Sequence, residues 1–137
     1  MKRRDARIEA FQLIFEMGFK DYSADELVYL AQESREVSFN DYTTRLIHIV
    51  YNHRDEIDDI INNNLTKWKS SRIPKTNLAI LRLAVAELKF MSDVPEKVSI
   101  NEAVELAKIY GTEDDSSFVN AVLGSVVKNN TFVKDEE

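Results

Sequence analysis

The chain has 137 residues, a formal net charge of −6, 44% apolar residues, 31% charged residues and no cysteine. This length fits one domain, and without cysteine the chain has no disulfides, thiolate metal sites or cysteine nucleophiles, which favours a cytoplasmic protein. The negative charge argues against nucleic-acid binding over the whole surface but leaves room for a local basic patch, and the apolar runs are too short to cross a membrane.

Apolar residues recur at helical spacing in seven segments, and three glycines with two prolines provide few turns. The first predicted helix covers about residues 4 to 17 and ends at Gly18. A Ser-x-x-Glu capping box beginning at Ser23 opens a short second helix. The inward face of this second helix is predicted to carry Leu27, Leu30 and Ala31.

Two apolar segments follow in the middle of the chain, one from about Phe39 to His53 and one from Ile57 to Trp68. Their spacing leaves open whether they form one bent helix or two. Pro74 presets the φ angle for a helix start. Residues 78–91 are apolar around most of the helix circumference, which predicts a central helix buried by neighbours on several sides.

A second Ser-x-x-Glu box predicts that a sixth helix starts at Ser99, with Val98 packed against Ala103 as a hydrophobic staple. Gly111 is expected to end this helix. The seventh helix is predicted to begin after residues 112–115, because carboxylates favour the positive end of a helix dipole.

The tail, about residues 129–137, is expected to fray. No internal repeat and no linker divides the sequence. The pattern therefore predicts one compact all-α domain over residues 1–137.

No group of residues in the sequence has the spacing of a catalytic or metal site. His48 and His53 are five residues apart and would lie on different sides of a helix. The single glycines cannot form a phosphate-binding loop, and Asp58-Asp59 lacks the spacing of a calcium loop. We therefore expect a protein that is not an enzyme and that uses no metal and no cofactor.

Four cations fall within the first seven residues of this otherwise acidic chain: Lys2, Arg3, Arg4 and Arg7. One interpretation is a solvated terminus with no specific partner. The alternative is contact with phosphates, because the planar arginine fork matches phosphate oxygens and would position RNA or DNA. Residue types alone leave both interpretations open.

The stretch VPEKVSINEAVELAKIYGTEDDSSFVNAVL, residues 94–123, resembles the carboxy-terminal signature of the NusB family of bacterial transcription antitermination factors. Residues 80–88 resemble the family's central helix, and residues 3–12 its opening segment. This resemblance implies a bundle of about seven helices in two small subdomains. It also implies an adaptor that binds the boxA element of nascent ribosomal RNA together with the ribosomal protein NusE, and indirectly other Nus factors and RNA polymerase.

The resemblance also implies roles for individual residues. The arginines would hold phosphates, Phe15 would stack on a base, and Asn77 would pair with a base edge or a protein partner. Asp114 matches the acidic residue that opens the last helix, although capping explains it as well. The implied RNA-binding residues are Lys2, Arg3, Arg4, Arg7, Phe15, Asn77 and Asp114. Relatives carry a basic residue where this chain has Ser116-Ser117, which removes a phosphate contact.

Two other functions remain as alternatives. The first is a helical protein–protein scaffold with little RNA affinity, suggested by the net charge of −6 and by Ser116-Ser117. The second is a domain that works with a methyltransferase, because the same fold occurs in some ribosomal RNA cytosine methyltransferases. The sequence leaves open whether the protein is a monomer or a homodimer.

Overall fold

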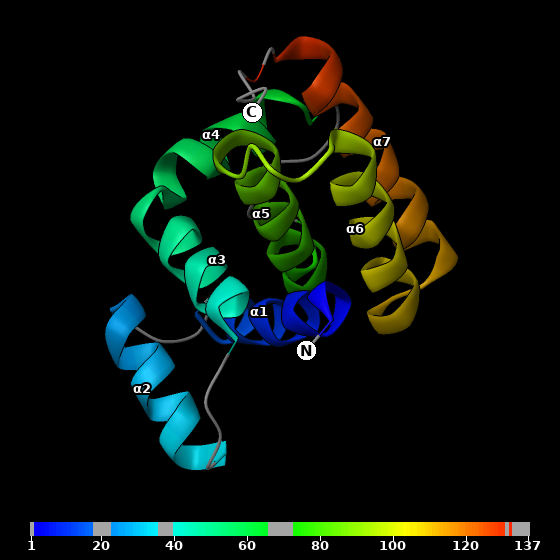
Figure 1. The fold of residues 1–137 in the computed structure, drawn as a ribbon. Helices are drawn as coiled ribbons and strands as arrows, with labels where there is room; N and C mark the ends of the chain where they lie inside the picture. Colours follow the sequence, from blue (N-terminus) through cyan, green and yellow to red (C-terminus); the bar gives the residue numbers. More distant parts are fainter. Residues whose placement is uncertain (1, 18–22, 36–39, 66–72, 131, 133–137) are drawn as a thin grey trace.

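The computed structural model describes residues 2–17, 23–35, 40–65, 73–130 and 132. These ranges contain seven α-helices and no strand, which confirms the predicted all-α fold (Figure 1). None of the helices described there is long and apolar enough to cross a membrane. The helices are α1 (Arg3–Met17), α2 (Ala24–Arg35), α3 (Asp41–Asn52), α4 (Arg54–Asn63), α5 (Lys75–Phe90), α6 (Glu96–Tyr110) and α7 (Glu113–Asn129).

Helix α5 is the centre of the fold, as the sequence predicted. Pro74 precedes it with φ −52° and ψ 139°, so the helix begins at Lys75, three residues before the first residue of the expected range. Ten consecutive residues, from Ala79 to Leu88, are buried. This burial follows from its position, because α5 packs against α1, α3, α4, α6 and α7.

The middle of the chain forms two helices rather than one bent helix. α3 begins after Asn40, whose side chain accepts a hydrogen bond from the Tyr42 amide at 2.8 Å. The break between α3 and α4 falls at His53, whose ring stacks on Phe90 with centroids 4.2 Å apart. Phe39 and Trp68, the expected outer limits, lie outside the described residues.

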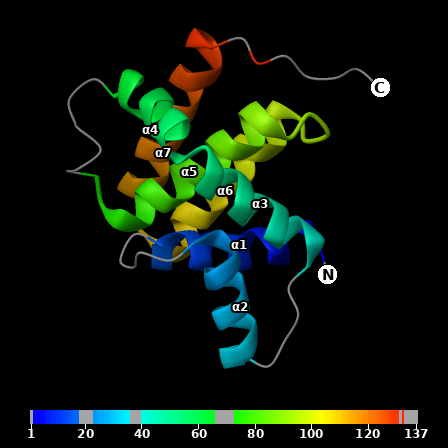
Figure 2. The ribbon, with the colours of Figure 1, turned by 90° about the vertical axis from the view of Figure 1, so that its left-hand side faces the viewer.

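Helix α2 confirms the serine half of the predicted capping box and only part of the predicted inward face. The Ser23 hydroxyl accepts a hydrogen bond from the Glu26 amide at 3.2 Å. Leu27 and Ala31 are buried, whereas Leu30 is 44% exposed, so its predicted inward position was wrong. The reason is that α2 packs on α3 and α1 along one side and projects from the rest of the molecule (Figure 2).

The predicted start of α6 was also wrong. Pro95 has φ −62° and sets the helix geometry early, so α6 begins at Glu96 and Ser99 lies inside its first turns. Ser99 is buried, and its hydroxyl has no hydrogen-bond partner among the residues that the structure describes. Val98 is 40% exposed and lies inside α6, so it does not precede a helix cap as the predicted staple required.

The turn between α6 and α7 combines the predicted stop with a capping box that the structure assigns to Thr112 and Asp115. Gly111 ends α6, and its amide donates to the Ala107 carbonyl at 2.9 Å. α7 begins at Glu113, within the acidic run rather than after it, because Thr112 and Asp115 form a capping box. A Cβ on Gly111 would lie 2.5 Å from the Asp115 carboxylate, so a side chain at this position would have to displace that capping carboxylate. Most of the predicted frayed tail lies outside the described residues.

Candidate nucleic-acid interface

Lys2, Arg3 and Arg4 lie at the exposed amino-terminal end of α1. Arg3 pairs with Asp93 in the loop between α5 and α6, with Nη2 and Oδ2 3.0 Å apart. The Arg3 guanidinium also lies over the Tyr42 ring, 4.7 Å from its centroid. This cation–π contact holds the guanidinium in place while its side chain stays 52% exposed.

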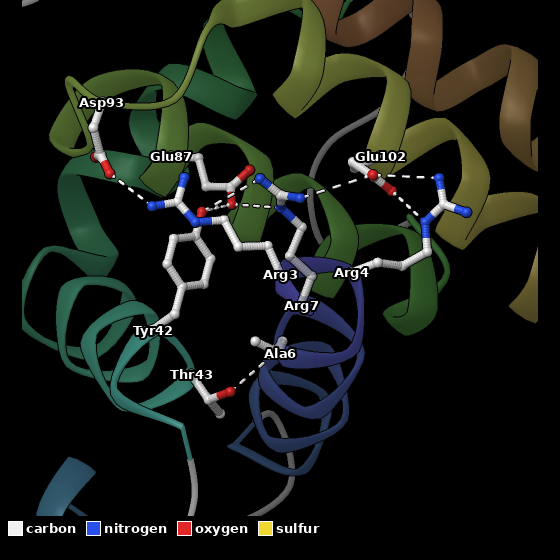
Figure 3. Close-up of polar contacts among 9 residues, drawn as sticks. All are labelled: Arg3, Arg4, Ala6, Arg7, Tyr42, Thr43, Glu87, Asp93 and Glu102. Carbon is white, nitrogen blue, oxygen red and sulfur yellow. Dashed lines mark hydrogen bonds and ion pairs between the residues drawn. The ribbon is translucent and has the colours of Figure 1, made fainter. Parts of the chain in front are cut away.

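Arg4 pairs with Glu102 on α6 through two hydrogen bonds, from Nε at 3.1 Å and from Nη2 at 3.3 Å (Figure 3). The hydrogen bond to Glu102, together with its negative charge, raises the pKa of Arg4. The arginine side chain is 61% exposed, so water and solutes reach it. Surface pairs of this kind stabilise a fold only weakly because water and salt screen them, so a phosphate can compete for the arginine.

Arg7 lies beneath the surface rather than on it. Its residue is 3% exposed, and its Nε donates to the buried Glu87 carboxylate at 2.7 Å. The Tyr42 hydroxyl donates to the same carboxylate, and Figure 3 shows the three side chains converging. Burial by itself would lower the pKa of Arg7, but the charge and hydrogen bond of Glu87 outweigh burial and raise it. This arginine ties α1 to α3 and α5.

Phe15 lies near the other end of α1, twelve residues from Arg3, which corresponds to about 18 Å along the helix. The side chain is half-buried and packs beside Phe11, with ring centroids 6.3 Å apart. It lines a cavity of about 100 Å³ together with Leu78 and Arg82. An aromatic edge is therefore present there beside two residues of α5.

Asn77 and Asp114 lie where α5 and α7 begin. Asn77 is 2% exposed, and its amide donates to Asp115 Oδ1 at 2.9 Å. This bond, followed by the one from the Thr112 amide, lowers the pKa of Asp115. Asp114 is exposed, and the capping carboxylate is that of Asp115. Asn77 therefore joins two helices, and Asp114 alone of this pair faces solvent.

The expected RNA-binding residues thus form two groups rather than one. Figure 2 shows α1 running from the amino terminus on the right to the side where α5 begins. The first group contains the exposed Lys2, Arg3 and Arg4. The second contains Phe15, near the other end of α1, with Asn77 and Asp114 at the starts of α5 and α7, and Arg7 belongs to neither because it is buried. Sequence reasoning missed the partners of the cations, because Asp93 and Glu102 are 90 and 98 residues away along the chain.

A seven-helix bundle around a buried central helix, with exposed cations where α1 begins, defines an all-α protein with a candidate phosphate-binding end. Residues 4–128 match the model of the NusB family. The chain therefore belongs to the NusB family, as its sequence signature indicated.

Curated relatives carry the name transcription antitermination protein NusB. One from Listeria monocytogenes is 40% identical over 126 residues, which cover 92% of this chain and 96% of the relative. One from Bacillus subtilis is 38% identical over 126 residues, covering 92% of this chain and 95% of the relative. The similarity therefore extends over almost the full length of both proteins.

Solved structures agree with this assignment. NusB from T. maritima has a TM-score of 0.80 and 32% identity, covering 95% of this chain and 93% of that one. A crystal structure of antitermination factors NusB and NusE in complex with dsRNA has a TM-score of 0.82 and 29% identity, covering 93% of this chain and 97% of the matched chain. The helical arrangement described above is thus the NusB fold.

Proposed function

We propose that this protein is an RNA-binding adaptor in transcription antitermination that binds boxA-like RNA of nascent ribosomal transcripts together with NusE. The observation that carries the proposal is the similarity, over 93% of the chain, to a NusB protein solved with NusE and dsRNA. The exposed cations at the start of α1 supply a physical basis. The protein acts by binding rather than by catalysis.

In this proposal the two groups of residues have different tasks. Lys2, Arg3 and Arg4 contact phosphates, which contribute affinity without reading sequence. Phe15 and its surroundings offer an aromatic edge for an unstacked base, and the exposed Asp114 at the start of α7 is available to RNA or NusE. Asn77 and Arg7 belong to the same interface but act by positioning, since both are buried and hydrogen-bonded within the fold.

The wider setting follows from the same role. Residues 1–137 work as one RNA-binding domain in the cytoplasm, and the link to other Nus factors and to RNA polymerase runs through RNA and NusE. We propose a monomer as the active form. Sedimentation of the free protein at several concentrations tests this point, and a stable homodimer would contradict it.

The direct test is fluorescence anisotropy with a labelled boxA RNA and a scrambled RNA of equal length, at two salt concentrations, with and without NusE. We expect preference for boxA, tighter binding with NusE and a steep loss of affinity with salt. Equal binding of both RNAs, with or without NusE, would contradict the adaptor role. Loss of all RNA binding with NusE binding retained would favour the scaffold function instead.

Replacing both Arg3 and Arg4 with alanine should weaken binding to boxA and scrambled RNA alike, because phosphate contacts carry no sequence information. If each arginine neutralises one phosphate, the salt slope should fall by about 1.4 for single-stranded RNA. The control is Lys128→Ala, an exposed lysine at the far end of α7, which should change neither value. Unchanged affinity in the double variant would remove the amino terminus from the interface.

The scaffold function keeps one supporting observation. Arg3 and Arg4 are each neutralised by a carboxylate within 3.1 Å, so the free surface is less basic than the sequence suggests. If the anisotropy test showed that the protein binds NusE but neither RNA, these two ion pairs would explain the missing RNA affinity.

A further inference from the structure

We propose that Arg45 on α3 completes a phosphate-binding site with Arg3, and that Asp93 occupies this site until RNA displaces it. The inference rests on the proposed RNA-binding function and adds a residue and a mechanism to it. No signal in the sequence links these three residues, since they lie in α1, α3 and the loop between α5 and α6. The structure brings them together.

The Asp93 carboxylate lies between two guanidinium groups from different helices. Its Oδ2 is 3.0 Å from Arg3 Nη2, and its Oδ1 is 3.9 Å from Arg45 Nη1. Both arginines carry the same 52% exposure, and Asp93 is 48% exposed. Two arginines that converge on one oxyanion form the arrangement that also suits a phosphate, whose oxygens accept from two donors at once.

The Arg3 guanidinium is held in place by the side chains on which it packs. Its guanidinium lies over the Tyr42 ring, and the Tyr42 hydroxyl donates to Glu87, which Arg7 also contacts at 2.7 Å. Figure 3 shows this buried network beneath the exposed Arg3–Asp93 pair. Because the ring is fixed, Arg3 keeps its position when its carboxylate partner leaves, and little side-chain order must be established on binding.

At neutral pH the Asp93 carboxylate competes with RNA phosphates for Arg3 and Arg45. Burial alone would raise the pKa of Asp93, but the hydrogen bond from Arg3 and the charges of Arg3 and Arg45 outweigh it and lower that pKa. The Asp93 carboxylate is therefore ionised, and an RNA phosphate must displace it from the arginines while it is charged. An exposed pair of this kind is weak enough for a phosphate chain with several contacts to do so.

The test uses the full-length protein and the same labelled boxA and scrambled RNAs. Asp93→Asn removes the competing charge and should tighten binding of both RNAs by roughly two- to fivefold, the range set by a surface ion pair. Arg45→Ala should weaken binding of both RNAs and lower the salt slope by about 0.7, because one phosphate contact is lost. Circular dichroism verifies that each variant folds.

Matched controls separate a local effect from a change in net charge. Glu96→Gln removes the same charge from an exposed position in the first turn of α6, and it should give a smaller gain than Asp93→Asn. Lys128→Ala is the control for Arg45→Ala. In an Arg3→Ala, Arg45→Ala background, Asp93→Asn should lose its advantage over Glu96→Gln, because no guanidinium remains to be released.

The possible results distinguish this inference from the proposed function. If Arg3 and Arg4 matter for RNA binding but Arg45→Ala and Asp93→Asn behave like their controls, the inference falls and the adaptor role stands. If both variants act as expected but boxA and scrambled RNA bind equally even with NusE, the phosphate site stands and the boxA function falls. Absence of RNA binding by both the wild type and Asp93→Asn would overturn the phosphate site.

Discussion

Arg7 shows how far a single residue can depart from its neighbours in sequence. Composition groups it with Arg3 and Arg4, but Arg7 is 3% exposed and pairs with a Glu87 that is fully buried. Its hydrogen-bond partners lie 80 and 35 residues away, so no local pattern reveals them. Arginine is thus exposed to solvent at positions 3 and 4 and buried in the core at position 7.

Arg7→Met should destabilise the protein by about 3–5 kcal/mol, because it leaves the Glu87 carboxylate buried without its guanidinium partner. Urea unfolding followed by circular dichroism measures this loss. The comparison is Arg3→Met, which breaks an exposed pair and should cost at most about 1 kcal/mol. Equal losses of stability in the two variants would show that the buried Arg7–Glu87 pair stabilises the fold no more than the exposed Arg3–Asp93 pair.

Individual elements depend on polar contacts at their ends and edges. Helix α2 packs mainly on α3 and α1, and one polar contact with α3 is the His48 ring, whose Nε2 lies 2.7 Å from Asp25. The start of α7 depends on Thr112, Asp115 and the buried Asn77 amide. These contacts position elements whose apolar faces alone would allow several orientations.

Docking of α2 should weaken as pH rises. The hydrogen bond to Asp25, with the Thr44 carbonyl, raises the pKa of His48. The stabilisation is therefore present below the ordinary histidine pKa of about 6.5 and is lost as pH rises through the higher folded value. Hydrogen exchange of α2 amides, corrected for intrinsic rates, should show less protection at high pH. In His48→Gln this difference should vanish, and equal pH dependence in both proteins would refute the role.

Asn77→Ala should destabilise the junction of α5 and α7 by about 1–2 kcal/mol at neutral pH. The lowered pKa of Asp115 means that its contribution is present above the unfolded value and is lost as pH falls through the folded value. The cost of the substitution should therefore shrink in acid, as urea unfolding at both pH values can show. Asn120→Ala, an exposed site on α7, should cost nothing. A cost for Asn77→Ala that is independent of pH would contradict this account.

The whole molecule is organised around α5, which packs against α1, α3, α4, α6 and α7; in Figure 1, α3 lies on one side of it and α6 and α7 lie on the other. The candidate interface is spread over this arrangement, because its cations pair with residues of the α5–α6 loop and of α6. Damage to the central helix should therefore affect both halves of the bundle and the interface together.

Leu81→Ala should lower the stability by about 2–5 kcal/mol, since Leu81 is fully buried in α5. Hydrogen exchange should show that amides of α3 and α6 lose protection to the same extent. Leu30→Ala, at an exposed position of α2, should change stability by about 0.5 kcal/mol or less. Loss of protection in only one half would show that the two halves unfold independently.

The sequence predictions were accurate where the contacts that decide the structure lie between neighbouring residues. The central helix, the Gly111 stop and the Ser23 cap depend on neighbouring residues, and all three were confirmed. The predicted cap at Ser99 failed because Pro95 started the helix earlier, and Leu30 failed because few elements cover α2. The RNA-binding roles of the site residues stay predictions, now with known exposure and partners.

By itself, the sequence determined the all-α class, the central helix and membership of the NusB family, because helical periodicity and a dense local signature are encoded in consecutive residues. Only the tertiary structure decided which cations face solvent, that Arg7 and Asn77 are buried, and that Asp93 lies between Arg3 and Arg45. Exposure and ion pairing arise between residues tens of positions apart, so they exist only after the helices have packed.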